Sequence, residues 1–113
     1  MKEIGHWIDG KMVAGSSGRF AEVMNPATGE VRAKVALASK AELDAAVAAA
    51  ERAQPGWAAT NPQRRARVMM KFADLINTHM DELAELVSAE HGKVLADGRG
   101  DVQRGLEVIE VCM

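Results

Sequence analysis

Residues 31–43 read VRAKVALASKAEL, and the spacing of the apolar side chains changes within this stretch. Up to Leu37, apolar and polar residues alternate with a period of two, which is typical of a half-buried strand. From Ser39 the apolar residues recur with the period of a helix. Ser39 and Glu42 have the spacing of a capping box, in which each side chain binds a free backbone N–H of the other residue. The sequence therefore predicts a change from strands to helices at Ser39.

The residues before this change carry two signals for antiparallel β ribbons. Asp9 and Gly10 separate two short apolar runs, and an Asp-Gly pair in that position is the strongest short-range hairpin signal. Further along, NPATGE at residues 25–30 supplies turn chemistry between an extended stretch and the strand that ends at Leu37. We therefore expect two successive ribbons over residues 6–37. Neither can be stable alone, because a two-stranded ribbon has no second layer to cover it.

The residues after the change carry start and stop signals for several helices. Asn61 and Pro62 open a helix, with Asn61 as the N-cap and Pro62 at the first helical position. Gly92 can end a later helix in the left-handed C′ conformation. The QPG sequence at 54–56 indicates an earlier helix end. The sequence predicts helices near residues 40–54, 62–77, 79–91 and 95–112.

The last of these helices has apolar residues on two sides. One side carries Leu95, Val102, Leu106 and Ile109, and the other carries Val108 and Val111. We therefore expect this helix to be buried between layers. Each glycine in a helix interior costs about 1 kcal/mol relative to alanine, so a helix that contains several indicates the close approach of another backbone. The glycines concerned are Gly98, Gly100 and Gly105.

Composition and charge exclude several classes of protein. The 113 residues include 14 Lys and Arg against 16 Asp and Glu, a net charge of -2, which argues against an electrostatic nucleic-acid binder. The longest apolar run is too short to span a membrane, and the first residues lack the pattern of a signal or transit peptide. A single cysteine excludes an internal disulfide and suits a reducing compartment. We expect a cytoplasmic protein with no nucleic-acid or membrane partner.

Two motifs are weak candidates for function. Gly98 and Gly100 flank Arg99 as they might in a nucleotide-binding loop, but such loops follow a strand and open a helix. Here the glycines lie inside a helical pattern, so we reject that interpretation. The basic cluster at 64–67 begins a helix, where cations slightly oppose the helix dipole. A solvated face is the expected role of its three arginines.

The histidines and the cysteine predict no metal site. None of His6, His79 and His91 has a second ligand three or four residues away, and Cys112 stands alone. We expect His91 at a helix C-terminus, where an imidazolium interacts well with the dipole. Cys112 has no neighbouring base in the sequence, and we expect it to be a buried, unreactive side chain.

Arg104 is the one candidate for ligand binding. The helical spacing places it opposite the Leu106 side, beside Val108 and next to the space left by Gly100. A buried arginine needs an anionic partner, because an unpaired buried charge is very costly. From spacing alone, the local carboxylates of Asp101 and Glu107 are the favoured partners. The alternative partner is a ligand carboxylate, which the guanidinium group can bind through two parallel hydrogen bonds.

Several of these stretches, in this order, resemble the N-terminal part of the NAD(P)-dependent aldehyde dehydrogenases. They are WIDGK at 7–11, NPATGE at 25–30 and EHGK at 90–93. RRARV at 64–68 and GDVQRGLE at 100–107 are most similar to the CoA-acylating methylmalonate-semialdehyde dehydrogenases. The resemblance implies an α/β fold, the aldehyde dehydrogenase fold, of which residues 1–113 would be an incomplete N-terminal segment. Residues 1–38 would form its β ribbons and residues 39–113 about four α-helices.

The resemblance also implies a reaction. A catalytic cysteine attacks the aldehyde, hydride passes to NAD, and the acyl group is transferred to coenzyme A with loss of the substrate carboxylate as CO₂ or bicarbonate. Such enzymes form propionyl-CoA or acetyl-CoA in valine and inositol breakdown, usually as homotetramers. An arginine at the position of Arg104 is expected to bind the substrate carboxylate. With the resemblance included, we favour this role over a local ion pair.

The family's catalytic cysteine, its oxyanion-hole asparagine and its nicotinamide-binding turn are expected beyond residue 113, and Cys112 is not the nucleophile. The sequence therefore predicts no catalytic, cofactor-binding or metal-binding residue within this chain, only the substrate-binding Arg104. Two hypotheses follow. The chain is an inactive N-terminal fragment of a semialdehyde dehydrogenase that uses NAD and coenzyme A, or it is a non-catalytic module that docks onto full-length subunits.

Overall fold

The computed structural model describes all 113 residues, which divide into two compact units, Met1–Ala59 and Thr60–Met113. The first unit contains all five strands and the first helix. The second contains three helices. The predicted change from strands to helices is confirmed, because the last strand ends at Ala36 and the first helix begins at Lys40. None of the four helices combines the length and apolar character that crossing a membrane requires.

A three-stranded sheet forms the larger part of the β structure. Strands β4 (Phe20–Met24) and β5 (Val31–Ala36) pair antiparallel, which confirms the second predicted ribbon. A strand that the sequence did not predict, β1 (Lys2–Ile4), pairs with β5 in parallel, so the order is β1-β5-β4. Three residues are too few to show a period of two, which explains why β1 was missed. The two buried side chains of this unit are Ala33 and Ala36 of β5.

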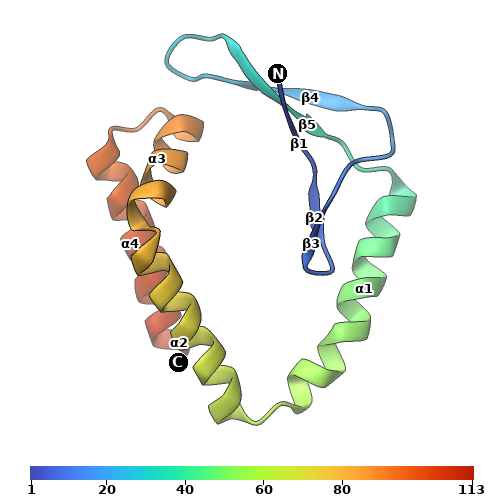
Figure 1. Cartoon of the computed structure of the whole chain (residues 1–113), viewed down its shortest axis with the longest axis vertical. Coiled ribbons are helices and arrows are strands. Elements are labelled where there is room, and N and C mark those ends of the chain that lie inside the picture. The colour runs from blue at the N-terminus through green and yellow to red at the C-terminus, as the bar shows by residue number, and fades with distance from the viewer. The chain divides into compact units, whose positions relative to one another are not determined.

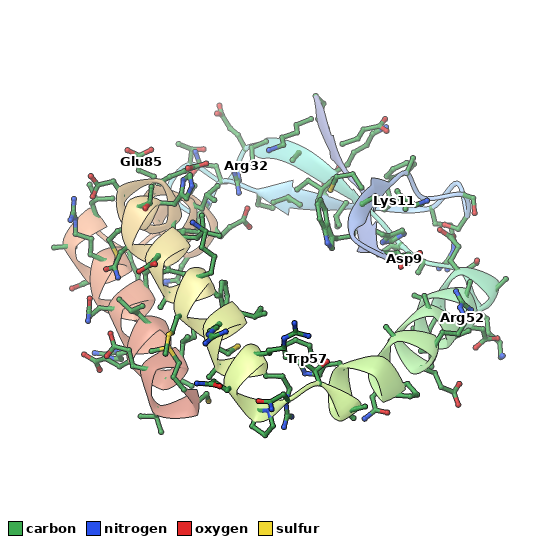
Figure 2. All side chains as sticks on the ribbon, turned by 60° about the horizontal axis from the view of Figure 1, so that its bottom comes forward. Asp9, Lys11, Arg32, Arg52, Trp57 and Glu85 are labelled. Atoms are coloured by element: carbon green, nitrogen blue, oxygen red, sulfur yellow. The ribbon has the colours of Figure 1, made fainter.

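The predicted hairpin at Asp9-Gly10 is confirmed. Strand β2 (His6–Ile8) pairs antiparallel with β3 (Lys11–Val13) in a separate two-stranded sheet. Asp9 has a φ angle of 53° and Gly10 of 74°, and two such positive angles are characteristic of the type I′ turn. Figure 2 shows Asp9 and Lys11 at the turn of this hairpin.

Helix α1 (Lys40–Ala59) starts at the predicted capping box and ends later than predicted. The Glu42 amide donates to Ser39 Oγ at 3.2 Å, and the Ser39 amide donates to Glu42 Oε1 at 3.1 Å. The predicted end near Gln54 was wrong, since the helix continues through Pro55. A proline removes one backbone hydrogen bond, and this part of α1 is exposed, so water can solvate the freed carbonyl group. The helix-forming alanines that follow then extend it to Ala59.

The three helices of the second unit match the predicted ranges to within one residue. They are α2 (Pro62–Thr78), α3 (Met80–His91) and α4 (Leu95–Cys112). Helix α4 runs back alongside α3 and α2 (Figure 1). Asn61 caps α2 as predicted, with its Oδ1 accepting from the Gln63 amide at 2.8 Å. The apolar core joins α2 to α4 and consists of Ala73, Leu106 and Ile109, with Met69, Ile76 and Met80 packed against it.

Only one side of α4 is covered, which corrects the prediction of a helix buried on two faces. Leu106 is 2% exposed, whereas Val108 and Val111 on the other side are 62% and 87% exposed. The physical reason is that α4 packs against α2 and α3 through one side only, and Val108 and Val111 lie on the other.

The three glycines of α4 also differ in how closely another helix approaches them. A Cβ at Gly98 would lie 2.8 Å from the Ala84 carbonyl oxygen, so the expected close approach is confirmed at this position. The expectation was wrong for Gly100 and Gly105, where an added Cβ would meet nothing within 4 Å.

Candidate functional site

A short turn between α3 and α4 sets the geometry around Arg104. Helix α3 ends with Gly92 in the left-handed conformation (φ 86°), as predicted, and the Gly92 amide donates to the Ser88 carbonyl at 2.8 Å. Val94 is extended, and its carbonyl accepts from the amides of Asp97 and Gly98 in the first turn of α4. Lys93 is therefore held between two fixed helix ends.

Lys93 forms an ion pair with α4. Its Nζ lies 2.6 Å from Asp101 Oδ2, and the two side chains are 32% and 31% exposed. The hydrogen bond from Lys93 is the main reason that the pKa of Asp101 lies below its usual value. Partial burial opposes this effect, and the positive charges of Lys93, Arg104 and His91 add to it. Asp101 is therefore an ionised carboxylate with one oxygen committed to Lys93.

Arg104 lies one helical turn after Asp101 and is 79% exposed, so the expectation of a buried arginine was wrong. Of its two predicted local partners, Asp101 is present, with Oδ1 at 3.5 Å from Arg104 Nη1. Glu107 instead accepts a hydrogen bond from Gln103 Nε2 at 3.4 Å. A single contact at 3.5 Å is at the outer limit of a hydrogen bond. Most of the guanidinium group therefore remains available to another anion.

The other basic residues near this site have different partners. Arg99, one turn before Gln103, forms an ion pair with Asp81 of α3. At the start of α2, Arg64 and Arg67 are exposed, as expected for a solvated face, whereas Arg65 is half-buried. Arg104 is thus the exposed arginine of α4 that is least engaged by its own chain.

The histidines lie apart from one another. His91 is in the last turn of α3, as predicted. His79 Nδ1 lies 2.9 Å from Glu82 Oε2, and His6 Nε2 lies 3.5 Å from Glu42 Oε2. No group of three or more His, Cys, Asp or Glu side chains is placed to hold a metal ion.

Cys112 is exposed near the end of α4, which corrects the prediction of a buried side chain.

The glycines of this chain lie outside its connection from a strand into a helix. A cradle for a dinucleotide needs a glycine-rich turn from a strand into a helix. The connection from β5 into α1 comprises residues 37–39 and contains no glycine. Gly98 and Gly100 lie within α4, as the helical pattern predicted.

A family model for aldehyde dehydrogenases matches residues 12–113. This chain belongs to the aldehyde dehydrogenase family. Its strands and helices match the N-terminal part of the aldehyde dehydrogenase fold, as the sequence predicted. The order of strands followed by helices in this chain is thus that of the N-terminal part of the family fold.

Curated relatives of this aldehyde dehydrogenase segment act on semialdehydes. It is 50% identical over 109 residues to malonate-semialdehyde dehydrogenase 3 of Geobacillus kaustophilus, covering 96% of this chain and 22% of that protein. It is 45% identical over 104 residues to the human mitochondrial acylating methylmalonate-semialdehyde/malonate-semialdehyde dehydrogenase, covering 92% of this chain and 19% of that protein. The chain thus spans about a fifth of the length of the curated relatives it matches.

Solved structures that are similar to this chain include proteins named methylmalonate-semialdehyde dehydrogenases. A protein of Sinorhizobium meliloti, provisionally named a methylmalonate-semialdehyde dehydrogenase and solved with NAD, has 64% identity and a TM-score of 0.95. The match covers 98% of this chain and 23% of that one. The methylmalonate-semialdehyde dehydrogenase of Oceanimonas doudoroffii has 43% identity and a TM-score of 0.94, with coverage of 99% and 23%. Both solved structures are therefore similar in fold to this segment over nearly all of its residues.

The ion pair between Lys93 and Asp101 was not predicted from the sequence. Eight residues separate them, a spacing that brings no two side chains together within a single helix. The signal that could have found the pair is Gly92, because a helix stop directly before Lys93 turns that residue toward the start of the next helix.

Proposed function

We propose that residues 1–113 form the N-terminal segment, an incomplete domain, of an NAD-dependent, CoA-acylating semialdehyde dehydrogenase. Its reaction would convert methylmalonate or malonate semialdehyde, coenzyme A and NAD to propionyl-CoA or acetyl-CoA, CO₂ or bicarbonate, and NADH. The identity of 45–50% to relatives named for these substrates supports the proposal. We place the enzyme in valine and inositol breakdown, in the cytoplasm, and expect a homotetramer.

Within this segment the proposal assigns the substrate carboxylate to Arg104. The observation that supports this assignment is the exposed guanidinium group, which has one weak contact to Asp101 and leaves most of its donors unused. A semialdehyde that carries a carboxylate needs a fixed cation to orient it. The planar guanidinium group provides two parallel donors for a carboxylate, and an ammonium group does not.

In the whole enzyme NAD would accept the hydride and coenzyme A would accept the acyl group. The residues that hold them are expected outside this segment, as the resemblance to the family implies. The segment would instead orient the substrate through Arg104, with the turn at Gly92 and Lys93 fixing the start of α4.

The decisive experiment compares two aldehydes. Residues 1–113 are grafted in place of the equivalent segment of the Geobacillus kaustophilus enzyme, and kcat/KM is measured for methylmalonate semialdehyde and for propanal. In Arg104→Leu we expect a loss of about 2–5 kcal/mol in transition-state stabilisation for the semialdehyde, the cost of breaking a charge pair that the bound substrate and the rest of the enzyme bury. Propanal has no carboxylate, so its kcat/KM should change much less.

Two further variants serve as controls. Arg104→Lys keeps the positive charge but loses the two parallel hydrogen-bond donors of the guanidinium group. It should therefore also impair the semialdehyde reaction. Arg99→Leu removes an arginine of the same helix that is paired with Asp81, and it should not discriminate between the two aldehydes. Equal losses on both substrates in Arg104→Leu would refute the assignment and make Arg104 a structural partner of Asp101.

The 113-residue chain alone should reduce no NAD, because the proposal places the nucleophile and the cofactor site outside it. NADH formation in proportion to purified chain would overturn this part. The alternative, a module that docks onto full-length subunits, is favoured by the exposed apolar side chains Val108 and Val111 of α4. Co-sedimentation of the chain with the Geobacillus kaustophilus enzyme tests it, and independent sedimentation would exclude it.

A further inference from the structure

The carboxylate of Asp101 lies between two cations that come from different parts of the second unit. The Nζ atom of Lys93, in the turn before α4, lies 2.6 Å from Asp101 Oδ2. Arg104, in the next turn of α4, faces Oδ1 at 3.5 Å. The carboxylate therefore favours the lysine strongly, although the arginine is the nearer residue in sequence.

This arrangement matters because Asp101 is the natural competitor of any ligand for Arg104. Residues three apart on a helix lie on the same face, so an arginine can reach a carboxylate one turn earlier. An arginine and a carboxylate pair best through two parallel hydrogen bonds. A pair of this kind between Arg104 and Asp101 would occupy the same two N–H donors that a ligand carboxylate needs. In the structure that bidentate pair is absent, and Lys93 holds one of the two oxygens it would require.

The net charge of these three side chains also favours the binding of a ligand carboxylate by Arg104. Lys93, Asp101 and Arg104 together carry one net positive charge, which matches the single negative charge of a ligand carboxylate. Without Lys93, Asp101 and Arg104 would neutralise each other. The lysine is held in place by the glycine turn before it and by the start of α4 after it, so its position does not depend on a ligand.

We propose that Lys93 is a positioning residue that holds Asp101 away from Arg104 and so keeps the guanidinium group free for the substrate carboxylate. This inference rests on the proposed role of Arg104. It differs from a purely structural role, in which the Lys93–Asp101 pair would only fasten the turn to α4. The two roles predict different outcomes when both partners are removed together.

The test uses the grafted enzyme described above and separates KM from kcat. In Lys93→Met we expect the KM for methylmalonate semialdehyde to rise about tenfold, the effect of losing about one charge-assisted contact to the ligand. The kcat for that substrate and both constants for propanal should remain within about twofold, because only carboxylate binding is affected.

The double variant Lys93→Met/Asp101→Asn is the decisive comparison. With no carboxylate left to compete for Arg104, the KM should return to within about threefold of the unaltered graft. Asp101→Asn alone should not raise it. A double variant as impaired as Lys93→Met, or equal effects on propanal, would show a structural pair and overturn the inference.

The failure of this inference is distinguishable from failure of the proposed function. If Arg104→Leu discriminates between the aldehydes while Lys93→Met leaves the KM unchanged, the function stands and the inference is refuted. If Arg104→Leu does not discriminate, the role of Arg104 is refuted and the inference fails with it.

A second measurement on the 113-residue chain covers the case in which the grafted variants are inactive. Rotation of the Arg104 guanidinium group, followed by ¹⁵N NMR, should slow in Lys93→Met and recover in the double variant. Identical rotation in all three proteins would contradict the proposal.

Discussion

The two units have similar lengths but differ in what they bury. In Met1–Ala59 the buried side chains are the two alanines of β5, and α1 contains none. In Thr60–Met113 the helices enclose Leu106 and Ile109 together with two alanines. An alanine methyl group removes far less apolar surface from water than a leucine side chain, so burial stabilises the second unit more than the first.

In the first unit, hydrogen bonds around Glu42 connect segments that are distant in the sequence. This carboxylate accepts from the Ser39 amide at the start of α1 and from the Ser16 amide in the loop after β3, and it lies 3.5 Å from His6 of β2. Three segments are thus joined by one side chain. Regular secondary structure alone therefore does not indicate a large apolar core, since the first unit contains five strands and a 20-residue helix.

The largest expected effect comes from the core of the second unit. Leu106→Ala should lower its stability by about 2–5 kcal/mol, because a buried leucine is replaced by a cavity. Leu43→Ala in α1, where the leucine is exposed, should stay within about 0.5 kcal/mol. Urea unfolding followed residue by residue by NMR measures both. Comparable losses in the two variants would mean that the units do not differ in the way described.

The second-largest effect is a difference in stability between substitutions at two glycines of α4. Gly98→Ala should destabilise the second unit by about 1–3 kcal/mol, since the new Cβ would lie 2.8 Å from the Ala84 carbonyl oxygen. Gly105→Ala meets open space and should stabilise it by about 0.5–1 kcal/mol through helix propensity. Thermal unfolding monitored by circular dichroism shows whether each substitution raises or lowers the stability. A stabilising Gly98→Ala would show that α3 and α4 approach less closely.

A smaller effect is expected at the start of α1. Ser39→Ala removes the acceptor of the Glu42 amide and should cost the first unit about 1 kcal/mol, as for other helix caps. Ser39→Asp, which retains a capping oxygen, should preserve most of the stability. Chemical shifts of residues 40–44 report whether the first turn of α1 remains helical. No change in Ser39→Ala would mean that the cap contributes nothing.

The smallest effect is a dependence on acid. The hydrogen bonds from the Ser39 and Ser16 amides hold the pKa of Glu42 below its ordinary value of about 4.5. The ionised form is therefore favoured by folding, so its contribution is complete above that value and is lost as the pH falls through the lower pKa of the folded state. Unfolding of the first unit, measured at several pH values, should lose this part of its acid sensitivity in Glu42→Gln. An unchanged profile would contradict the role of Glu42.

The helices could be predicted from the sequence because their signals are local. Asn61, Pro62 and Gly92 fix helix ends through their own conformations, and the structure has them where the sequence placed them. Strand β1 and the end of α1 could not be predicted. Strand β1 pairs with β5 through residues that are far apart in the sequence, such as Lys2 and Ala33. The continuation of α1 past Pro55 occurs where the helix is exposed to solvent.

The site was harder to predict than the fold. The sequence indicated Arg104 and its neighbour Asp101, because they share one helix face. Helical spacing cannot show that Glu107 binds Gln103 or that Val108 and Arg104 lie exposed, since this depends on which side of α4 meets other helices. The contact of Lys93 with Asp101 depends on a turn between two helices, a feature with no periodic pattern.

The proline inside α1 has a consequence for hydrogen exchange. Pro55 has no amide proton and cannot donate to the carbonyl of Glu51, so the last turn of α1 is attached by fewer backbone hydrogen bonds than the turns before it. None of the residues of α1 is buried, and most of the stability of helices in proteins comes from the packing of an apolar face, so α1 lacks that contribution. The amide protons after Pro55 should therefore exchange with solvent first, and those of α4 around Leu106 last.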